Sequence, residues 1–210
     1  MHRMGARSSA ATAVALGATS WTGLEYGLHR FAMHQLRGRG LASVEHLKHH
    51  ADVTYFSPAS KKAASAAATT AIVLPMATAV AGRRRALEFT AGLICMYYAY
   101  EVAHRRTHTH PPRGRYSRWT RRSHMHHHFG APMRNFGVTT PIWDRLFGTH
   151  EDPGVVSVPQ RMAPMWMLDD SGAVRAELAA DYVVNAGRAR NTTQDDRDRL
   201  DAFANIAPDL

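Results

Sequence analysis

The amino-acid sequence predicts an all-α integral membrane protein with a histidine-rich helical cap on the cytoplasmic side. Three apolar segments, at residues 10–28, 63–81 and 86–103, are each close to the ~20 residues that span a bilayer as a helix. The chain of 210 residues also contains 14 histidines, most of them in recurring spacings outside these segments. This length suffices for one or two domains with a buried core. We expect a membrane domain at residues 1–150 and a soluble tail at residues 151–210.

The composition narrows the classes of partner and of metal site. The formal net charge is +9 and the isoelectric point is about 10.3, which suits an anionic membrane surface or an acidic partner. We expect no nucleic-acid partner, because no zinc-finger, homeodomain or RNA-binding pattern accompanies the charge. Cys95 is the single cysteine, so a disulfide or a thiolate metal site within one chain is excluded. Nitrogen and oxygen atoms must therefore hold any metal.

The first apolar segment, residues 10–28, carries one formal charge, at Glu25, and leads directly into His29. A basic start followed by an Ala-rich stretch also fits a cleaved signal peptide. Cleavage would remove the helix that carries the first two histidines. We therefore favour a retained membrane helix, with the N-terminus on the side opposite the histidines.

The second and third segments are separated only by residues 81–85, which are too few for anything but a turn. The two segments therefore form an antiparallel hairpin, and both of its open ends lie on one side. A membrane helix tolerates Pro75 when neighbours satisfy the freed carbonyl. The alternative is a soluble helical bundle whose buried faces are mostly alanine.

This topology brings all four histidine groups to one face of the membrane. Basic residues gather on the same face, which the positive-inside rule makes cytoplasmic, although the Arg83–Arg85 cluster lies opposite. The basic residues on the histidine side are Arg30, Arg37, Arg39, Lys48, Lys61, Lys62, Arg105, Arg106 and the arginines from Arg113 to Arg122.

The rest of the chain is expected to be peripheral. Pro111 and Pro112 end the third helix, and an amphipathic helix is predicted at residues 117–128. A short helix follows at residues 143–147. Beyond Glu151 the composition becomes charged, which indicates a soluble tail with one or two small surface helices.

Ten histidines form the candidate metal site. The pattern H-x-x-H-H occurs twice, and on a helix its three imidazoles fall within roughly 100° of one another. His104 and His108 are four apart and share a face, whereas His29 and His34 are five apart, roughly 140° around a helix. Ten imidazoles exceed what one ion accepts, so two ions are implied, and iron, zinc, copper or nickel suits imidazole. The ten are His29, His34, His46, His49, His50, His104, His108, His124, His127 and His128.

The remaining histidines, His2, His110, His126 and His150, are expected to be ordinary surface or hydrogen-bonded residues. A soluble carboxylate-bridged bundle would need Glu-x-x-His on two helices. The sequence supplies one match, Glu101 to His104, so this alternative is weak.

The flanking residues of these boxes resemble the fatty acid hydroxylase superfamily over roughly residues 21–150. The closest similarity is to membrane fatty acid 2-hydroxylases, whose relatives include sterol desaturases, C-4 methyl sterol oxidases and carotenoid hydroxylases. The motifs are Trp21-Thr22-x-x-Glu25-Tyr26-x-x-His29-Arg30-Phe31-x-x-His34, both H-x-x-H-H boxes, Tyr100-Glu101-x-x-His104-x-x-x-His108, Asn135-Phe136-Gly137 and Trp143-Asp144-x-Leu146-Phe147-Gly148-Thr149.

The resemblance implies a non-haem di-iron oxidoreductase on the cytoplasmic membrane face, ligated by the ten histidines, with no separate catalytic side chain. It would use O₂ to hydroxylate a lipid acyl chain; desaturation or oxidation of a sterol-like or carotenoid lipid is the alternative on the same centre. Zinc fits the same ligands but has no redox chemistry. A non-catalytic membrane zinc-binding protein is therefore the alternative of another class.

Other residues are candidates for supporting roles. Asp144 and Glu101 could accept the second N–H of a ligand histidine, with a helix cap or a surface salt bridge as the alternative for Asp144. Trp143 and Tyr26 could line a lipid channel, with packing alone as the alternative. Four arginines could hold a lipid phosphate, a coenzyme A headgroup or an acidic electron donor, with ordinary attraction to anionic lipid as the alternative: Arg105, Arg106, Arg121 and Arg122.

The sequence departs from the family pattern in two respects. It has no room for the N-terminal cytochrome b5 domain of fused fatty acid 2-hydroxylases. We therefore expect a separate electron-donor protein of cytochrome b5 or ferredoxin type. Only one apolar segment precedes His29, where the family often has two.

Overall fold

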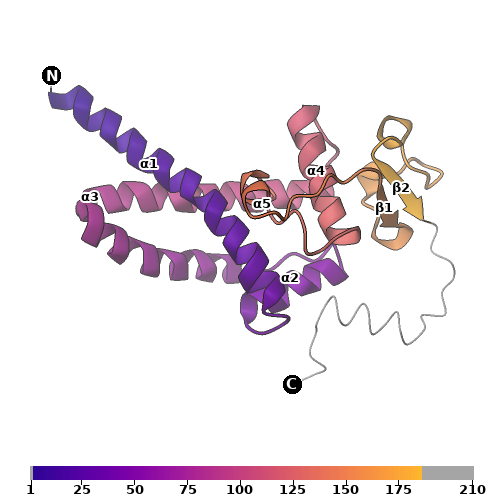
Figure 1. Cartoon of the computed structure of the whole chain (residues 1–210), viewed down its shortest axis with the longest axis horizontal. Coiled ribbons are helices and arrows are strands. Elements are labelled where there is room, and N and C mark those ends of the chain that lie inside the picture. Colours follow the sequence, from indigo (N-terminus) through magenta and orange to yellow (C-terminus); the bar gives the residue numbers. More distant parts are fainter. Residues whose placement is uncertain (1, 186–210) are drawn as a thin grey trace. The chain divides into compact units, whose positions relative to one another are not determined.

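The computed structural model describes residues 2–185, and residues 2–9 by their backbone only. The chain divides into two compact units. One unit contains the chain up to Glu25 together with Ser57–Val102, and the other contains Tyr26–Phe56 and the chain from Ala103 onward. The order of the helices and strands can be followed in Figure 1.

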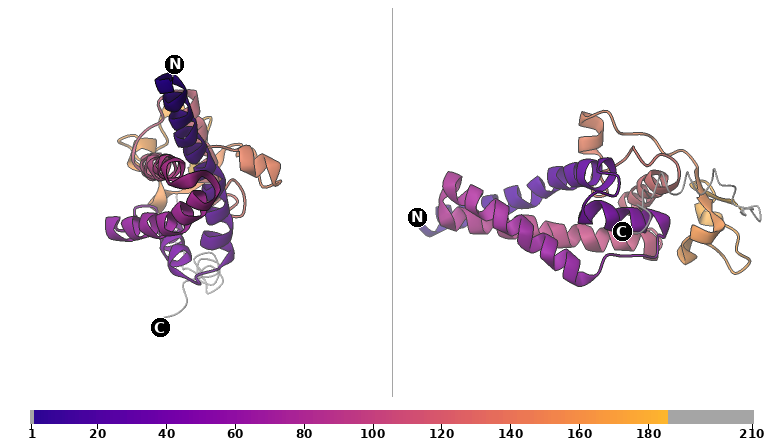
Figure 2. Two further views of the ribbon diagram at one scale, coloured as in Figure 1. Left: turned by 90° about the vertical axis from the view of Figure 1, so that its left-hand side faces the viewer. Right: turned by 90° about the horizontal axis from the view of Figure 1, so that it is seen from below.

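The first unit is built from helices α1 (His2–Gly27) and α3 (Ala59–Thr109). Figures 1 and 2 show that α3 doubles back on itself to form the hairpin predicted between the second and third apolar segments. The bend lies at Gly82, whose φ of 76° and ψ of 157° are non-helical. Such a conformation is readily adopted by glycine because it has no Cβ.

Two glycines allow α1 and α3 to approach at backbone distance. A Cβ built on Gly17 would lie 1.9 Å from the carbonyl oxygen of Phe89, and one on Gly92 would lie 2.0 Å from that of Val14. Small residues at helix crossings are typical of membrane helix pairs, where close packing replaces the hydrophobic effect. Further along, the Trp21 ring packs on Tyr97 and Tyr100, at centroid distances of 5.0 and 5.6 Å.

Among the described residues, Ala59–Thr109 is the helix that is long and apolar enough to cross a membrane. Only 6% of its most apolar stretch is buried within the structure, unlike the core helix of a soluble protein. Val80, for example, is 89% exposed. The first predicted span, residues 10–28, lies in α1, and α1 does not reach the same apolar character.

The second unit holds the histidines. A π-helix, η1 (Leu28–Gln35), continues the chain after α1 and is followed by α2 (Leu41–Ala51). The last turns of α3 then lead to α4 (Gly114–Phe129) and the short α5 (Ile142–Leu146). The helices predicted at residues 117–128 and 143–147 are therefore confirmed, with α4 beginning three residues earlier and α5 shifted by one residue.

The segment after Glu151 contains strands where small surface helices were expected. Strands β1 (Val156–Pro159) and β2 (Tyr182–Asn185) pair in parallel, with Val156 opposite Tyr182. Three short 3₁₀ turns lie between them, at Gln160–Met162, Met165–Met167 and Ala176–Leu178. The helix expectation is wrong here because the strands are rich in valine, whose branched side chain suits a pleated surface. Residues 186–210 of the expected tail lie outside the described residues.

Candidate metal centre

The ten histidines form two groups, in each of which the candidate ligand atoms lie within 4.8 Å of one another. Cluster 1 consists of His29, His34, His46, His50 and His127. Cluster 2 consists of His49, His104, His108, His124 and His128. All ten side chains belong to the second unit, and all but the half-buried His50 are buried. His110, His126 and His150 lie outside both clusters, and the side chain of His2 lies outside the described residues.

The π-helix explains how His29 and His34 reach the same cluster. In an α-helix, residues five apart diverge by roughly 140°. A π-helix instead forms hydrogen bonds from residue i to residue i+5, so residues five apart lie about one turn apart on one face. The ring centroids of His29 and His34 are accordingly 5.1 Å apart. From the sequence, His29 and His34 could reach one site only at a helix end, or else serve different ions. The π-helix places both in cluster 1.

Each H-x-x-H-H box contributes to both clusters. In α2, His46 and His50 belong to cluster 1 and His49 belongs to cluster 2. The split follows from helix geometry: relative to His46, His50 is rotated by about 40° and His49 by about 60° in the opposite sense. In α4 the same spacing sends His127 to cluster 1 and the outer pair, His124 and His128, to cluster 2. The two clusters are thus neighbours that share two helices.

The nitrogen atoms in cluster 1 are spaced as metal ligands would be and cannot all be hydrogen-bonded to one another. His46 Nε2 lies 3.0, 2.9 and 3.0 Å from the Nε2 atoms of His29, His34 and His50, respectively. A neutral imidazole offers one N–H and one lone pair, so one nitrogen cannot form three such bonds. Ligands about 2.1 Å from an ion and at right angles to each other would be about 3.0 Å apart, which is the observed spacing.

Two backbone carbonyls fix the tautomers in cluster 1. His29 Nδ1 lies 2.5 Å from the carbonyl oxygen of Phe136, and His127 Nδ1 lies 2.7 Å from that of Arg134. A carbonyl only accepts, so each Nδ1 carries the hydrogen and each Nε2 presents its lone pair to the cluster. Asn135, between the two acceptor residues, is in the left-handed region with φ 53°. Asparagine tolerates this conformation, and Asn135 is the first residue of the Asn-Phe-Gly motif.

Cluster 2 has the same nitrogen spacing. His108 Nε2 lies 3.1 Å from His49 Nε2 and 2.8 Å from His124 Nε2, and His128 Nε2 lies 3.1 Å from His124 Nε2. His49 Nδ1 lies 2.8 Å from the carbonyl oxygen of Tyr55. Among the described residues, the buried Nδ1 atoms of His108, His124 and His128 have no hydrogen-bond partner. The nitrogen atoms of both clusters therefore fit a metal ion. The clusters differ in how many of their Nδ1 atoms have a hydrogen-bond partner that orients the ring.

Burial favours the neutral form of eight of the ten imidazoles, the protonation state that a metal ligand needs. Burial lowers the pKa of His29 to about 4, although the Phe136 carbonyl and Asp144 act in the opposite direction. Burial and the neighbouring His29 lower the pKa of His34 to about 2. Burial, followed by neighbouring imidazoles, also puts the pKa well below its usual value at His46, His50, His108, His124, His127 and His128.

Asp144 supports His29 through a peptide group, so the direct contact predicted from the sequence is wrong. Its buried carboxylate accepts the backbone N–H groups of Phe136, at 2.9 Å, and Gly137, at 2.7 Å. The peptide that joins these two residues presents its carbonyl to His29 and its N–H to Asp144. A Cβ on Gly137 would lie 2.1 Å from the Thr140 carbonyl oxygen and 2.9 Å from Asp144 Oδ2, so this approach requires glycine.

The other carboxylate predicted to accept a histidine N–H, Glu101, is paired elsewhere. Among the described residues it forms an ion pair with Lys62 within the first unit. The two aromatic candidates are packed: Tyr26 OH lies 3.1 Å from Thr149 Oγ1, and the Trp143 ring stacks on Phe147 at 6.3 Å. A lipid-lining role for these two rings remains a prediction.

Two of the four arginines proposed to hold a headgroup are already engaged. Arg121 is buried and donates to the carbonyl oxygens of Arg106, His110 and Ser117, at 2.8, 2.7 and 2.9 Å. Arg122 pairs with Asp181 at 3.3 Å and donates to the Gly154 carbonyl at 2.8 Å. Arg105 and Arg106 remain exposed. Only the latter two are left as candidates for a headgroup or partner contact.

The described chain thus combines a mostly helical fold, two clusters of five imidazoles that could each hold a metal ion, and a helix long and apolar enough to cross a membrane. Residues 14–149, more than half of the chain, match the fatty acid hydroxylase family. The chain therefore belongs to the fatty acid hydroxylase family, as its motifs predicted, and that family is one of iron-dependent oxygenases.

Similar proteins agree with this assignment. The chain is 26% identical to the dihydroceramide fatty acyl 2-hydroxylase FAH2 of Arabidopsis thaliana, over 70% of this chain and 63% of the relative. It is 30% identical to the fatty acid 2-hydroxylase of Rattus norvegicus, over 64% of this chain and 38% of the relative. A solved structure of full-length scs7p, in which only the hydroxylase domain is visible, superposes with a TM-score of 0.58. That match has 25% identity and covers 69% of this chain and 57% of the other. The chain thus spans less than two thirds of the relatives it matches.

Proposed function

We propose that this protein hydroxylates the acyl chain of a membrane lipid, using O₂ and two iron ions held by clusters 1 and 2. The observation that carries the proposal is the convergence of five imidazoles at each cluster, nine of the ten buried, with ring nitrogens spaced as the ligands of a cation would be. Family membership and relatives named as fatty acid and dihydroceramide 2-hydroxylases support the choice of reaction.

The ten histidines would act as ligands, and no other side chain is assigned a catalytic role. Iron, when bound, supplies the reduction of O₂ and the removal of hydrogen from an unactivated C–H bond. The chain favours the neutral form of most of the ligands, orients His29 and His127 through backbone carbonyls, and keeps nearly all ten side chains buried from water. One oxygen atom enters the C–H bond and the other leaves as water. The required electrons and protons must come from outside the site.

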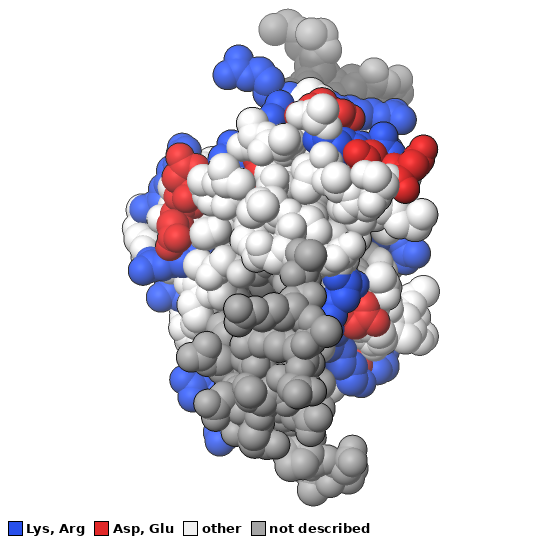
Figure 3. Space-filling model, turned by 90° about the vertical axis from the view of Figure 1, so that its right-hand side faces the viewer, with Lys and Arg blue, Asp and Glu red and all other residues white. Residues whose placement is uncertain are grey.

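The proposal includes the source of the electrons and the side of the membrane. A separate protein of cytochrome b5 or ferredoxin type would supply the electrons, and the clusters would face the cytoplasm. Figure 3 shows a face on which both basic and acidic side chains lie around an area without charged side chains. The net charge of +9 favours an anionic lipid surface or an acidic donor. Residues 1–150 would form the membrane hydroxylase domain and residues 151–210 a soluble C-terminal segment.

The decisive experiment is lipid mass spectrometry on cells that express the intact chain or a His127→Ala variant. A gain of one oxygen on an acyl lipid that disappears in the variant is the expected result, because cluster 1 loses a ligand. His126→Ala is the matched control: His126 is adjacent in α4, lies outside both clusters and contacts Glu151 at 3.1 Å. This control should retain the product.

Other outcomes would change the conclusion. A loss of two hydrogens from the lipid would identify a desaturase on the same centre. Full activity in His127→Ala would contradict the ligand assignment. Purified protein that holds zinc alone and changes no lipid when supplied with iron, donor and O₂ would favour the zinc-binding alternative.

A further inference from the structure

The C-terminal segment 151–185 lies beyond the family match, which ends at residue 149, yet it is folded against α4, which carries three of the ten cluster histidines. Its buried core includes Met125, which is fully buried and directly follows His124 in α4. The other members of this core are Val156, Val158, Trp166, Met167, Leu178 and Tyr182. The segment therefore packs on α4 at the position of a cluster 2 histidine.

Trp166 reaches the backbone of a second cluster 2 histidine. Its indole N–H donates to the carbonyl oxygen of His108 at 3.0 Å, and the ring is 7% exposed. His108 lies in the last turn of α3, where carbonyl groups lack partners within the helix. In the same turn the carbonyls of Arg106 and His110 accept hydrogen bonds from Arg121. The Arg121 guanidinium lies 5.9 Å from the centre of the Trp166 ring.

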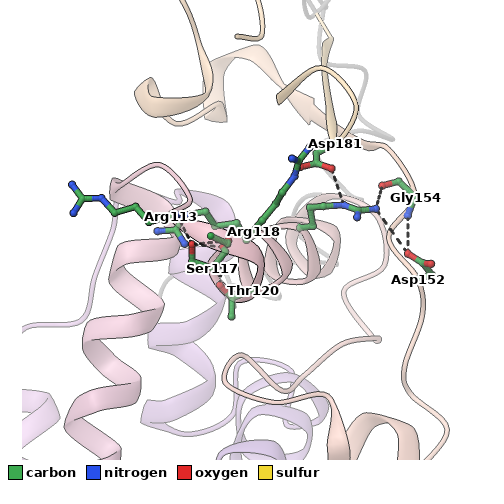
Figure 4. Close-up of polar contacts among 10 residues, drawn as sticks. Arg113, Ser117, Arg118, Thr120, Asp152, Gly154 and Asp181 are labelled. Carbon is green, nitrogen blue, oxygen red and sulfur yellow. Dashed lines mark hydrogen bonds and ion pairs between the residues drawn. The ribbon is translucent and has the colours of Figure 1, made fainter. Parts of the chain in front are cut away.

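A buried carboxylate makes the second attachment. Asp181, immediately before β2, is 4% exposed and pairs with Arg118 and Arg122 of α4. Figure 4 shows Arg118 directed at Asp181, away from the Arg113–Ser117 contacts at the start of the helix. The Asp181 carbonyl accepts the N–H of Val156 at 2.8 Å, so the ion pairs are anchored to the strand pair.

We infer that residues 151–185 form a brace that positions the ligands of cluster 2, with Trp166 as its principal positioning residue. The inference rests on the proposed function, in that the clusters hold metal ions. Cluster 2 needs such support because the Nδ1 atoms of His108, His124 and His128 have no partner among the described residues. The brace fixes the backbone of α3 and α4 from outside instead, through the His108 carbonyl and Met125.

The test is the release of metal from the detergent-solubilised full chain to an excess of chelator. Trp166→Phe keeps an aromatic ring in the core but removes the indole N–H. We expect the ion in cluster 2 to leave about tenfold faster than in the wild-type protein, since loss of a group that orients a ligand typically weakens a metal site by about 10–100-fold. The other ion, in cluster 1, should leave at the wild-type rate. Trp119→Phe is the matched control, because Trp119 is a half-buried residue of α4 that packs on Tyr116.

The outcomes separate the brace from its premise. If both ions leave Trp166→Phe at wild-type rates, the inference is wrong. If both leave equally faster, Trp166 stabilises the whole fold and does not position cluster 2, which also contradicts the inference. A wild-type chain that binds fewer than two ions would contradict the proposed function and the inference with it. Should Trp166→Phe fail to fold, Asp181→Asn provides the same test, since it weakens the ion pairs to α4 and should also accelerate one ion selectively.

Discussion

Clusters 1 and 2 each contain five imidazoles with a similar nitrogen spacing, but their imidazoles are held in place by different contacts. In cluster 1, His29 and His127 each donate an Nδ1–H to a carbonyl of the loop after α4, and Asp144 supports that loop. In cluster 2, His49 has such an acceptor, whereas three others have none among the described residues. Two sites with the same number of imidazoles can therefore differ in their affinity for a metal ion, because this affinity depends on the contacts that orient each ligand.

The largest expected effect comes from removing one ligand from either cluster. His34→Ala takes a ligand from cluster 1 and His124→Ala takes one from cluster 2. Each variant should bind one ion per chain instead of two and lose more than about 100-fold of the lipid product, since a direct ligand matters more than an outer partner. Elemental analysis of the purified variants and lipid mass spectrometry measure the two effects. Loss of both ions from either variant would show that the clusters are one cooperative site.

A smaller and more selective effect is expected for Asp144→Asn. The amide keeps the size of the side chain but replaces one acceptor oxygen with a donor, so one of the buried N–H groups of Phe136 and Gly137 loses its partner. We expect the affinity of cluster 1 for Fe²⁺ to fall by about 10–100-fold while cluster 2 is unchanged. Competitive titration with a chelator of known affinity measures both sites. Asp152→Asn, at a 90% exposed side chain, is the control; equal weakening of both clusters would contradict the peptide-mediated route.

The smallest effect is expected for Gly137→Ala, which perturbs the same loop sterically. The added Cβ would meet the Thr140 carbonyl oxygen at 2.1 Å, so the loop must shift. We expect a loss of about 1–3 kcal/mol in stability, the usual cost of overpacking, and a weaker cluster 1. Gly27→Ala is the matched control, because a Cβ at Gly27 has no neighbour within 4 Å. Thermal unfolding in detergent measures the stability, and a variant as stable as the control would show that the loop adapts freely.

Several features were predictable because they depend on residues close together in the sequence. The ten candidate histidines, the hairpin with its turn near Gly82, and the helices at α4 and α5 follow from spacing, apolar length and helix breakers. The strands of residues 151–185 were missed, because four-residue elements carry little periodic signal and the charged composition favoured a surface tail.

The sequence by itself determined the family of this protein, through the motifs around its histidines, and predicted that imidazoles act as metal ligands and suffice for two ions. The structure decided which ligands share a cluster. A π-helix brings His29 and His34 onto one face, and tertiary packing joins His49 of α2 with histidines of α3 and α4 in cluster 2. It also decided that Asp144 acts through a peptide and that Trp166 reaches the end of α3. The physical reason is that spacing along a helix fixes local directions, whereas a metal site closes only when distant helices meet.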